Sequence, residues 1–197
     1  MVEENEVEVV EVKSNANVDV KDRLRGDWTK QLDLVKAIVA KGCTNEEFQL
    51  LCYTAKLYGL NPLKKEIWAV KYTGKPALVF TSRDGFLTIA HSTGQFGSME
   101  TTFEMPPNVP GTIKSVPAVP VSATCTIWRK DYDKPFKCTV YFDEYNQKQA
   151  LWLSKPKMML QKVAESSCLR RAFNISGLYA PEEIDADNTV NNTEVKE

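Results

Sequence analysis

The stretch TNEEFQLLCYTAKLYGLNP, residues 44–62, carries the clearest structural signal in the chain. It opens with a threonine and, three residues later, Glu47, a pair that can cap each other's backbone amides at the start of a helix. Apolar residues then recur at helical spacing until Gly59, a residue that commonly ends helices, and Asn61-Pro62 forces a turn. The stretch predicts one complete helix followed by a change of structure.

The residues before this helix predict another. Asp27 can cap a helix over residues 28–41, and Gly42 ends it. The expected apolar stripe of this helix consists of Leu32, Val35, Ile38 and Val39. The folded part of the chain is therefore expected to begin with two helices.

The sequence after residue 62 alternates between strand and helix patterns. In chain order it predicts a hairpin over 67–72 and 77–81, a helix over 83–92, an extended segment over 96–104, a loop over 105–120, a hairpin over 121–129 and 136–142, and a helix over 156–173. Ser82 can cap the first of these helices, and Pro156 suits the first position of the last. Five prolines keep the loop out of a central strand.

These elements together predict an α+β fold. We expect a single domain with N-terminal helices, two β-hairpins in a small antiparallel sheet, and a long C-terminal helix. The expected domain spans residues 21–180, between an acidic segment at 1–20 and a second acidic segment at 181–197, both expected to be disordered.

The net charge of −1 conceals a strongly uneven distribution. Residues 1–20 and 180–197 each carry a net charge of −5, whereas residues 21–179 carry +9. Acidic ends either keep a protein in solution or also compete with nucleic acid for a basic surface. The basic interior removes the objection that a near-neutral chain would not bind nucleic acid.

The basic residues gather in two clusters. Residues 56–83 carry a net charge of +5 and residues 155–171 carry +4, which is the kind of sequence-independent charge that binds phosphates. The aromatic residues within or beside the first cluster are Trp68, Tyr72, Phe80 and Phe86. Each could stack on a base, although core packing is the more common role of such a residue. In the second cluster, Arg170 continues an apolar helical stripe, as a partly buried, phosphate-reaching arginine would.

Other functional classes have little support in the sequence. The five cysteines include no Cys-x-x-Cys pair and there is one histidine, so zinc-ligand spacing is absent and free thiols are expected. No P-loop motif occurs, and neither a secretory signal nor a membrane-length apolar run is found. The acids that a two-metal nuclease could use are Glu66, Asp84, Asp143 and Glu144.

A series of short motifs lies along the expected domain in a recognisable order. They are Tyr58-Gly59-Leu60-Asn61-Pro62, Lys65-Glu66-Ile67, Asp84-Gly85-Phe86, Gln95-Phe96-Gly97-Ser98-Met99, Thr124-Cys125-Thr126-Ile127-Trp128-Arg129-Lys130-Asp131, Ser154-Lys155-Pro156-Lys157-Met158-Met159-Leu160, Cys168-Leu169-Arg170-Arg171-Ala172-Phe173 and Gly177-Leu178-Tyr179. Together they resemble the RecT/Bet family of phage single-strand annealing proteins over roughly residues 40–185.

The resemblance implies an ATP-independent recombination protein without a covalent catalytic centre. Such a protein binds single-stranded DNA, pairs it with a complementary strand, and forms rings or helical filaments on the annealed duplex. It implies a homo-oligomer in the bacterial cytoplasm, working beside a phage exonuclease and the host single-strand-binding protein, with no cofactor beyond Mg²⁺ as an aid to annealing. The DNA-binding residues expected from the motifs and the basic clusters are Lys41, Lys65, Lys75, Arg129, Lys130, Lys157, Arg170 and Arg171.

Two alternatives stay open at this point. A binding module would coat single strands without pairing them, and a metal-dependent nuclease would degrade them. The lack of an Arg/Asn/Gln recognition helix favours annealing or coating, because an annealer holds phosphates and leaves base edges free.

Overall fold

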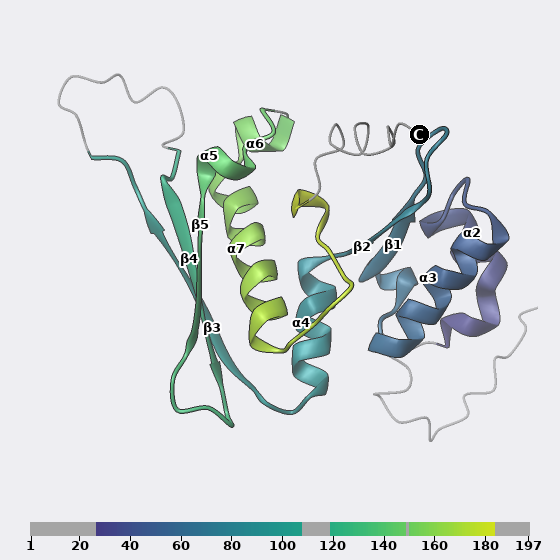
Figure 1. Cartoon of the computed structure of the whole chain (residues 1–197), viewed down its shortest axis with the longest axis horizontal. Coiled ribbons are helices and arrows are strands. Elements are labelled where there is room, and N and C mark those ends of the chain that lie inside the picture. The colour runs from purple at the N-terminus through teal and green to yellow at the C-terminus, as the bar shows by residue number, and fades with distance from the viewer. Residues whose placement is uncertain (1–26, 108–118, 149, 184–197) are drawn as a thin grey trace, which may run out of the picture.

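The computed structural model describes residues 27–107, 119–148 and 150–183. The α-helices, 3-10 helices (η) and strands are, in order, η1 (Trp28–Gln31), α2 (Leu32–Val39), α3 (Asn45–Tyr58), η2 (Pro62–Lys64), β1 (Ile67–Val70), β2 (Leu78–Thr81), α4 (Arg83–Ser92), β3 (Phe96–Glu104), β4 (Ser122–Arg129), β5 (Phe136–Tyr141), α5 (Phe142–Tyr145), α6 (Ala150–Ser154), α7 (Pro156–Ala172) and η3 (Pro181–Glu183). Figure 1 shows α4 between two packed parts, one built on each sheet.

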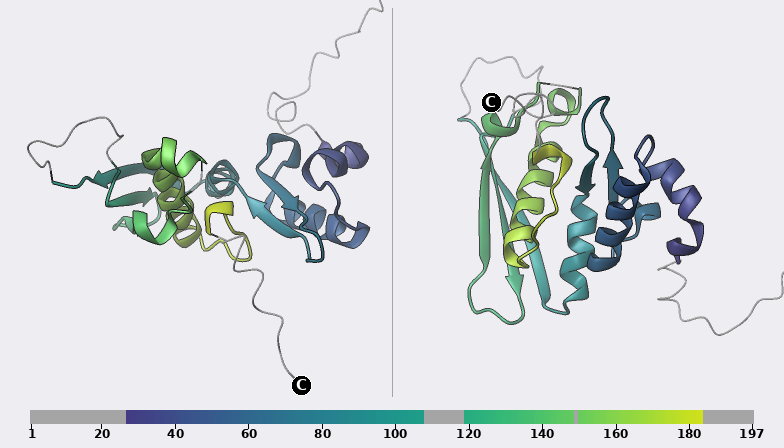
Figure 2. Two further views of the ribbon diagram at one scale, coloured as in Figure 1. Left: turned by 90° about the horizontal axis from the view of Figure 1, so that it is seen from above. Right: turned by 45° about the vertical axis from the view of Figure 1, so that its right-hand side comes forward.

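The larger part is an antiparallel sheet, in the order β3-β4-β5, with α7 across one face (Figures 1 and 2). Alternation along β4 puts Cys125 and Ile127, both fully buried, on the same face of the strand. The Sγ of Cys168 on α7 lies 3.5 Å from the Cys125 carbonyl oxygen, so the helix sits directly on this face. On the opposite face, Thr124 and Thr139 are hydrogen-bonded across β4 and β5 at 2.8 Å.

The smaller part consists of the β1–β2 hairpin with α2 and α3. Val35 and Val39 of α2 are buried, as are Leu51 and Ala55 of α3. The predicted four-residue stripe of α2 is wrong in half its members, because Leu32 and Ile38 are 42% and 55% exposed. Val35 and Val39, one turn apart, are the buried residues of this short helix, so the core covers only a narrow apolar stripe.

Most of the other predicted elements are confirmed. The capping box of α3 is present, Gly59 ends that helix in a left-handed conformation, and Ser82 caps α4. The α+β class is confirmed, with the two hairpins in separate sheets rather than in one. Residues 1–20 and most of the proline-rich loop lie outside the described residues, and the first three residues of the predicted acidic segment at 181–197 form η3.

The remaining sequence expectations concern thiols and membranes. The five cysteines are free thiols, and Cys43, Cys125 and Cys168 are buried. Within the ranges that the structure describes, no helix combines the length and apolar character needed to cross a bilayer.

Candidate nucleic-acid interface

Two hollows on the surface share Trp68 and Ser82 among their lining residues and therefore adjoin; we call the two together the basic groove. The first has a volume of about 770 Å³ and the second about 250 Å³. The first is lined by Ile38, Val39, Lys41, Lys65, Trp68, Ala69, Val70, Lys71 and Ser82. The second is lined by Trp68, Ser82, Arg83, Asp84, Lys162, Pro181 and Glu182. The groove thus brings together basic residues from the segment after α2, the end of η2, the β1–β2 connection, α4 and α7.

Lys41 and Lys65, both predicted from the sequence, lie in the first hollow and are exposed. Lys65 ends η2 in a left-handed conformation, with φ of 57°. Its amide donates to the Pro62 carbonyl at 2.9 Å, and the buried Glu66 carboxylate accepts from the Asn61 amide at 2.7 Å. The tight Asn61-Pro62 turn therefore places the Lys65 side chain at the groove.

Lys71 also lines the first hollow, and its ammonium group forms an ion pair with Glu47. The Glu47 carboxylate lies 2.5 Å from Lys71 Nζ and also accepts from the backbone amides of Thr44 and Ala77, each at 2.9 Å. The hydrogen bond from Lys71, followed by those two amides, lowers the pKa of Glu47 to about 2. Lys71 belongs to the first basic cluster of the sequence, but the sequence does not show that a residue of the α3 capping box holds it.

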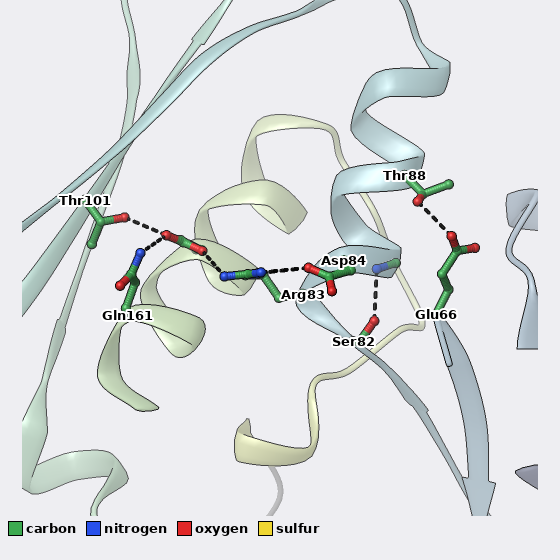
Figure 3. A network of polar contacts seen from close by, with 9 residues as sticks. Glu66, Ser82, Arg83, Asp84, Thr88, Thr101 and Gln161 are labelled. Atoms are coloured by element: carbon green, nitrogen blue, oxygen red, sulfur yellow. Dashed lines mark hydrogen bonds and ion pairs between the residues drawn. The ribbon is translucent and has the colours of Figure 1, made fainter. Parts of the chain in front are cut away.

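Arg83 lies at the N-terminus of α4, where Ser82 accepts from the Gly85 amide at 3.0 Å. Its guanidinium contacts two carboxylates, Asp84 at 2.8 Å and Glu165 of α7 at 3.3 Å (Figure 3). The hydrogen bond to Asp84, then the charges of both carboxylates, raise the pKa of Arg83 against the effect of burial.

The Glu165 carboxylate anchors this network in the interior. Its side chain is 5% exposed and accepts from Gln161 at 2.7 Å and from Thr101 of β3 at 3.1 Å (Figure 3). A buried carboxylate needs this kind of partnering, because an unpaired one would lose most of its hydration. The network joins α4, α7 and β3 and fixes Arg83 beside the groove.

Arg83 and Lys162 were counted in the basic clusters of the sequence but were not singled out as site residues. Their only sequence signal was membership of a cluster. Lys162 becomes a groove residue because α7 passes alongside α4, a contact that periodicity along one helix does not predict.

Lys157 and Arg170, also predicted from the sequence, lie on α7 but do not line the groove. Lys157 is exposed, with Nζ 5.3 Å from the centre of the Phe103 ring. Arg170 stacks over Tyr179 at 4.7 Å and forms an ion pair with Glu183. Arg170 is thus half-buried, as the sequence suggested, and is held by the segment that follows α7.

The remaining predicted residues lie at other places in the fold. Arg129 donates to the Ala172 carbonyl at the end of α7, pairs with Asp131 at 2.6 Å, and so caps the helix. Lys130 follows it in the β4–β5 turn, and Arg171 is exposed at the same end of α7; neither lines the groove. Lys75 belongs to the β1–β2 turn, where its amide donates to the Tyr72 carbonyl.

Among the aromatic candidates, Trp68 is the one that lines the groove. It is partly exposed and packs on Phe80 with ring centres 6.1 Å apart. Phe80 and Phe86 are buried core residues, and Tyr72 is 39% exposed near the hairpin turn. Trp68 therefore offers a surface on which a base can stack.

The candidate carboxylates of a nuclease do not converge. Glu66 is buried and accepts from the Thr88 hydroxyl at 3.1 Å, and Asp84 pairs with Arg83. Asp143 and Glu144 lie on α5, in the part of the molecule built on the larger sheet (Figure 1). Over the described ranges, no group of three or more His, Cys, Asp or Glu side chains could hold a metal ion.

The family model described as RecT family matches residues 27–196. The recombination protein Bet of Escherichia phage lambda is 31% identical over 160 residues. That match covers 76% of this chain and 55% of the phage protein, so the chain spans about half the length of this relative.

Proposed function

Because this chain belongs to the RecT family, we propose that it binds single-stranded DNA and pairs it with a complementary strand in homologous recombination. The observation that carries the proposal is the basic groove, lined by Lys41, Lys65, Lys71, Arg83 and Lys162. Phosphates would lie against these side chains, and Trp68, which lines both hollows, would stack on a base.

The groove suits a protein that does not read sequence. Lysines and arginines hold the backbone of a strand without contacting base edges, which stay available to a second strand. No P-loop motif occurs in the sequence, and the proposed pairing uses no ATP. Mg²⁺ would contribute by screening the repulsion between two phosphate backbones.

Self-association is part of the proposal. Large apolar side chains of α2 and α3 face solvent, with Ile38 55%, Tyr53 67% and Leu57 66% exposed. Such a surface suits contact with another copy of the chain, and an oligomer would gather many weak phosphate sites on one strand. A phage exonuclease and a host single-strand-binding protein are the proposed working partners.

The remaining candidates from the sequence are proposed as DNA contacts outside the groove. Lys157 and Arg170 lie on the same helix as Lys162, and they, together with Lys75, Arg129, Lys130 and Arg171, would meet other parts of a strand. Alanine substitution of each, measured by single-strand binding, assigns or removes them one at a time.

The direct test is the rate at which two complementary, fluorescently labelled oligonucleotides pair without ATP. We expect the protein to accelerate pairing above the protein-free rate, and a Lys41→Ala/Lys65→Ala variant to lose most of that acceleration. Lys134→Ala/Lys137→Ala, which removes the same charge from exposed positions near and on β5, is the matched control.

The alternatives give different results in the same assay. Slower pairing by a protein that binds tightly identifies a coating module. Strand degradation that requires Mg²⁺ and disappears in Asp84→Asn or Asp143→Asn identifies a nuclease. Electron microscopy of the mixture shows whether rings or filaments form on the annealed product.

A further inference from the structure

The segment that follows α7 runs back over the molecule and contacts the groove. We call residues 177–183 the C-terminal strap. Figure 1 shows it in yellow, between α7 and β2. Leu178 and Ala180 are buried, Tyr179 forms a parallel bridge with Phe80, and the Thr81 amide donates to the Tyr179 carbonyl at 2.9 Å. These contacts anchor the first half of the strap.

The second half of the strap is acidic and meets basic side chains. Glu182 lines the smaller hollow of the groove together with Arg83 and Lys162. Glu183 forms the ion pair with Arg170, and the side chains of this pair are 12% and 24% exposed. A carboxylate and a phosphate are bound by arginine in the same way, through hydrogen bonds from the guanidinium to anionic oxygens.

The Arg170–Glu183 pair is incompletely satisfied. Arg170 Nε and Glu183 Oε1 are both buried without a hydrogen-bond partner among the residues described. Burial raises the pKa of the Glu183 carboxyl, and the attraction of Arg170 only partly opposes this effect. A phosphate has more acceptor oxygens than the single carboxylate oxygen now used, so it could accept from Nε and Nη1 together.

We propose that the acidic end of the C-terminal strap occupies phosphate subsites at Arg83, Lys162 and Arg170, and that single-stranded DNA displaces it from them. The inference rests on the proposed function and deepens it, because it names phosphate subsites in the groove and at Arg170 outside it, and a segment that regulates them. The buried Leu178 and the Thr81–Tyr179 hydrogen bond hold the first half in place, so only residues 181–183 have to move.

The test compares the affinity of the full chain for a single-stranded oligonucleotide at low salt, measured by fluorescence anisotropy. Glu182→Gln/Glu183→Gln removes the competing charges and keeps the size of both side chains. We expect affinity to rise roughly threefold to tenfold, as when one or two partly screened charge pairs cease to compete. Asp143→Asn/Glu144→Gln, on exposed positions of α5, makes the same change in net charge and controls for long-range electrostatics.

Hydrogen exchange supplies the second measurement. The Glu183 amide donates to the Ala180 carbonyl at 3.1 Å, and we expect DNA to accelerate its exchange while the Thr81 amide stays protected. Equal affinities of the strap variant, the α5 control and the unaltered chain would overturn the strap inference, as would unchanged exchange at Glu183. If Lys41→Ala/Lys65→Ala still weakens binding in that case, the proposed function stands alone; if the unaltered chain binds no single-stranded DNA, the proposed function fails as well.

Discussion

The Lys65 backbone adopts a left-handed conformation that a lysine rarely takes, with φ of 57°. Such a conformation costs about 1–3 kcal/mol and persists only where surrounding contacts impose it. Here the Asn61 side chain accepts from the Leu63 amide at 2.9 Å, and Glu66 holds the Asn61 amide. The backbone strain therefore lies at a residue that lines the groove.

Exchanging Lys65 for two different small residues separates strain from charge. Lys65→Gly and Lys65→Ala both remove the ammonium group, so we expect equally weakened binding to single-stranded DNA. Glycine tolerates the left-handed conformation, so Lys65→Gly should be more stable than Lys65→Ala by about 1 kcal/mol. Thermal unfolding and oligonucleotide titration of both variants check this. Equal stability would show that the turn imposes no strain on residue 65.

At the scale of elements, α3 and the β1–β2 hairpin are joined through Glu47. One carboxylate completes the capping box at Thr44, holds Lys71, and accepts from the Ala77 amide on the other arm of the hairpin. The same side chain thus starts a helix, closes a hairpin and positions a groove lysine.

This role of Glu47 predicts a specific dependence of stability on pH. Its pKa falls from an ordinary 4.5 to about 2 in the folded protein, so its contribution is complete above the ordinary value and is lost as pH falls through the folded value. Glu47→Gln should unfold at a lower temperature at neutral pH, and the gap should close between pH 4.5 and 2. Melting curves across that range test it, and a gap that stays constant would contradict it.

The elements that the sequence predicts well are those with a local chemical marker. The caps at Thr44 and Ser82, the left-handed Gly59 and the first-turn Pro156 are all read within a few residues. Which strands pair is not local, so the separation of the two hairpins into different sheets could not be predicted.

Close backbone contacts between elements were equally hidden. A Cβ on Gly85 would lie 2.4 Å from the Glu66 carbonyl oxygen, so this glycine lets α4 approach β1. The Asp84-Gly85 motif marks the position in the sequence, but only the packing gives the reason.

The candidate site was predicted in the same uneven way. The sequence predicts Lys41 and Lys65 as DNA-binding residues, and both line the groove. Lys71 and Arg83 join them beside their ion pairs with Glu47 and Glu165. Lys162 joins them because α7 packs beside α4, and no sequence spacing reveals these contacts. Arg129 shows the converse, because its charge is used largely to cap α7 and to pair with Asp131.

At the scale of the whole molecule, the charge distribution acquires a structural meaning. Five basic residues of the interior, whose net charge is +9, line the groove, and the acidic segment after α7 begins by lining its smaller hollow. The net charge of −1 for the whole chain describes neither the basic groove nor the acidic segment.

The most direct measurement of the central claim is the salt dependence of single-stranded DNA binding. The slope of log affinity against log salt counts the phosphates neutralised, at about 0.7 per phosphate for single strands. Lys41→Ala/Lys65→Ala should flatten the slope by about 1.4, equally for oligonucleotides of different sequence, and Lys134→Ala/Lys137→Ala should leave it unchanged. A groove variant with the slope of the unaltered chain would contradict the account, because the groove would then hold no phosphates.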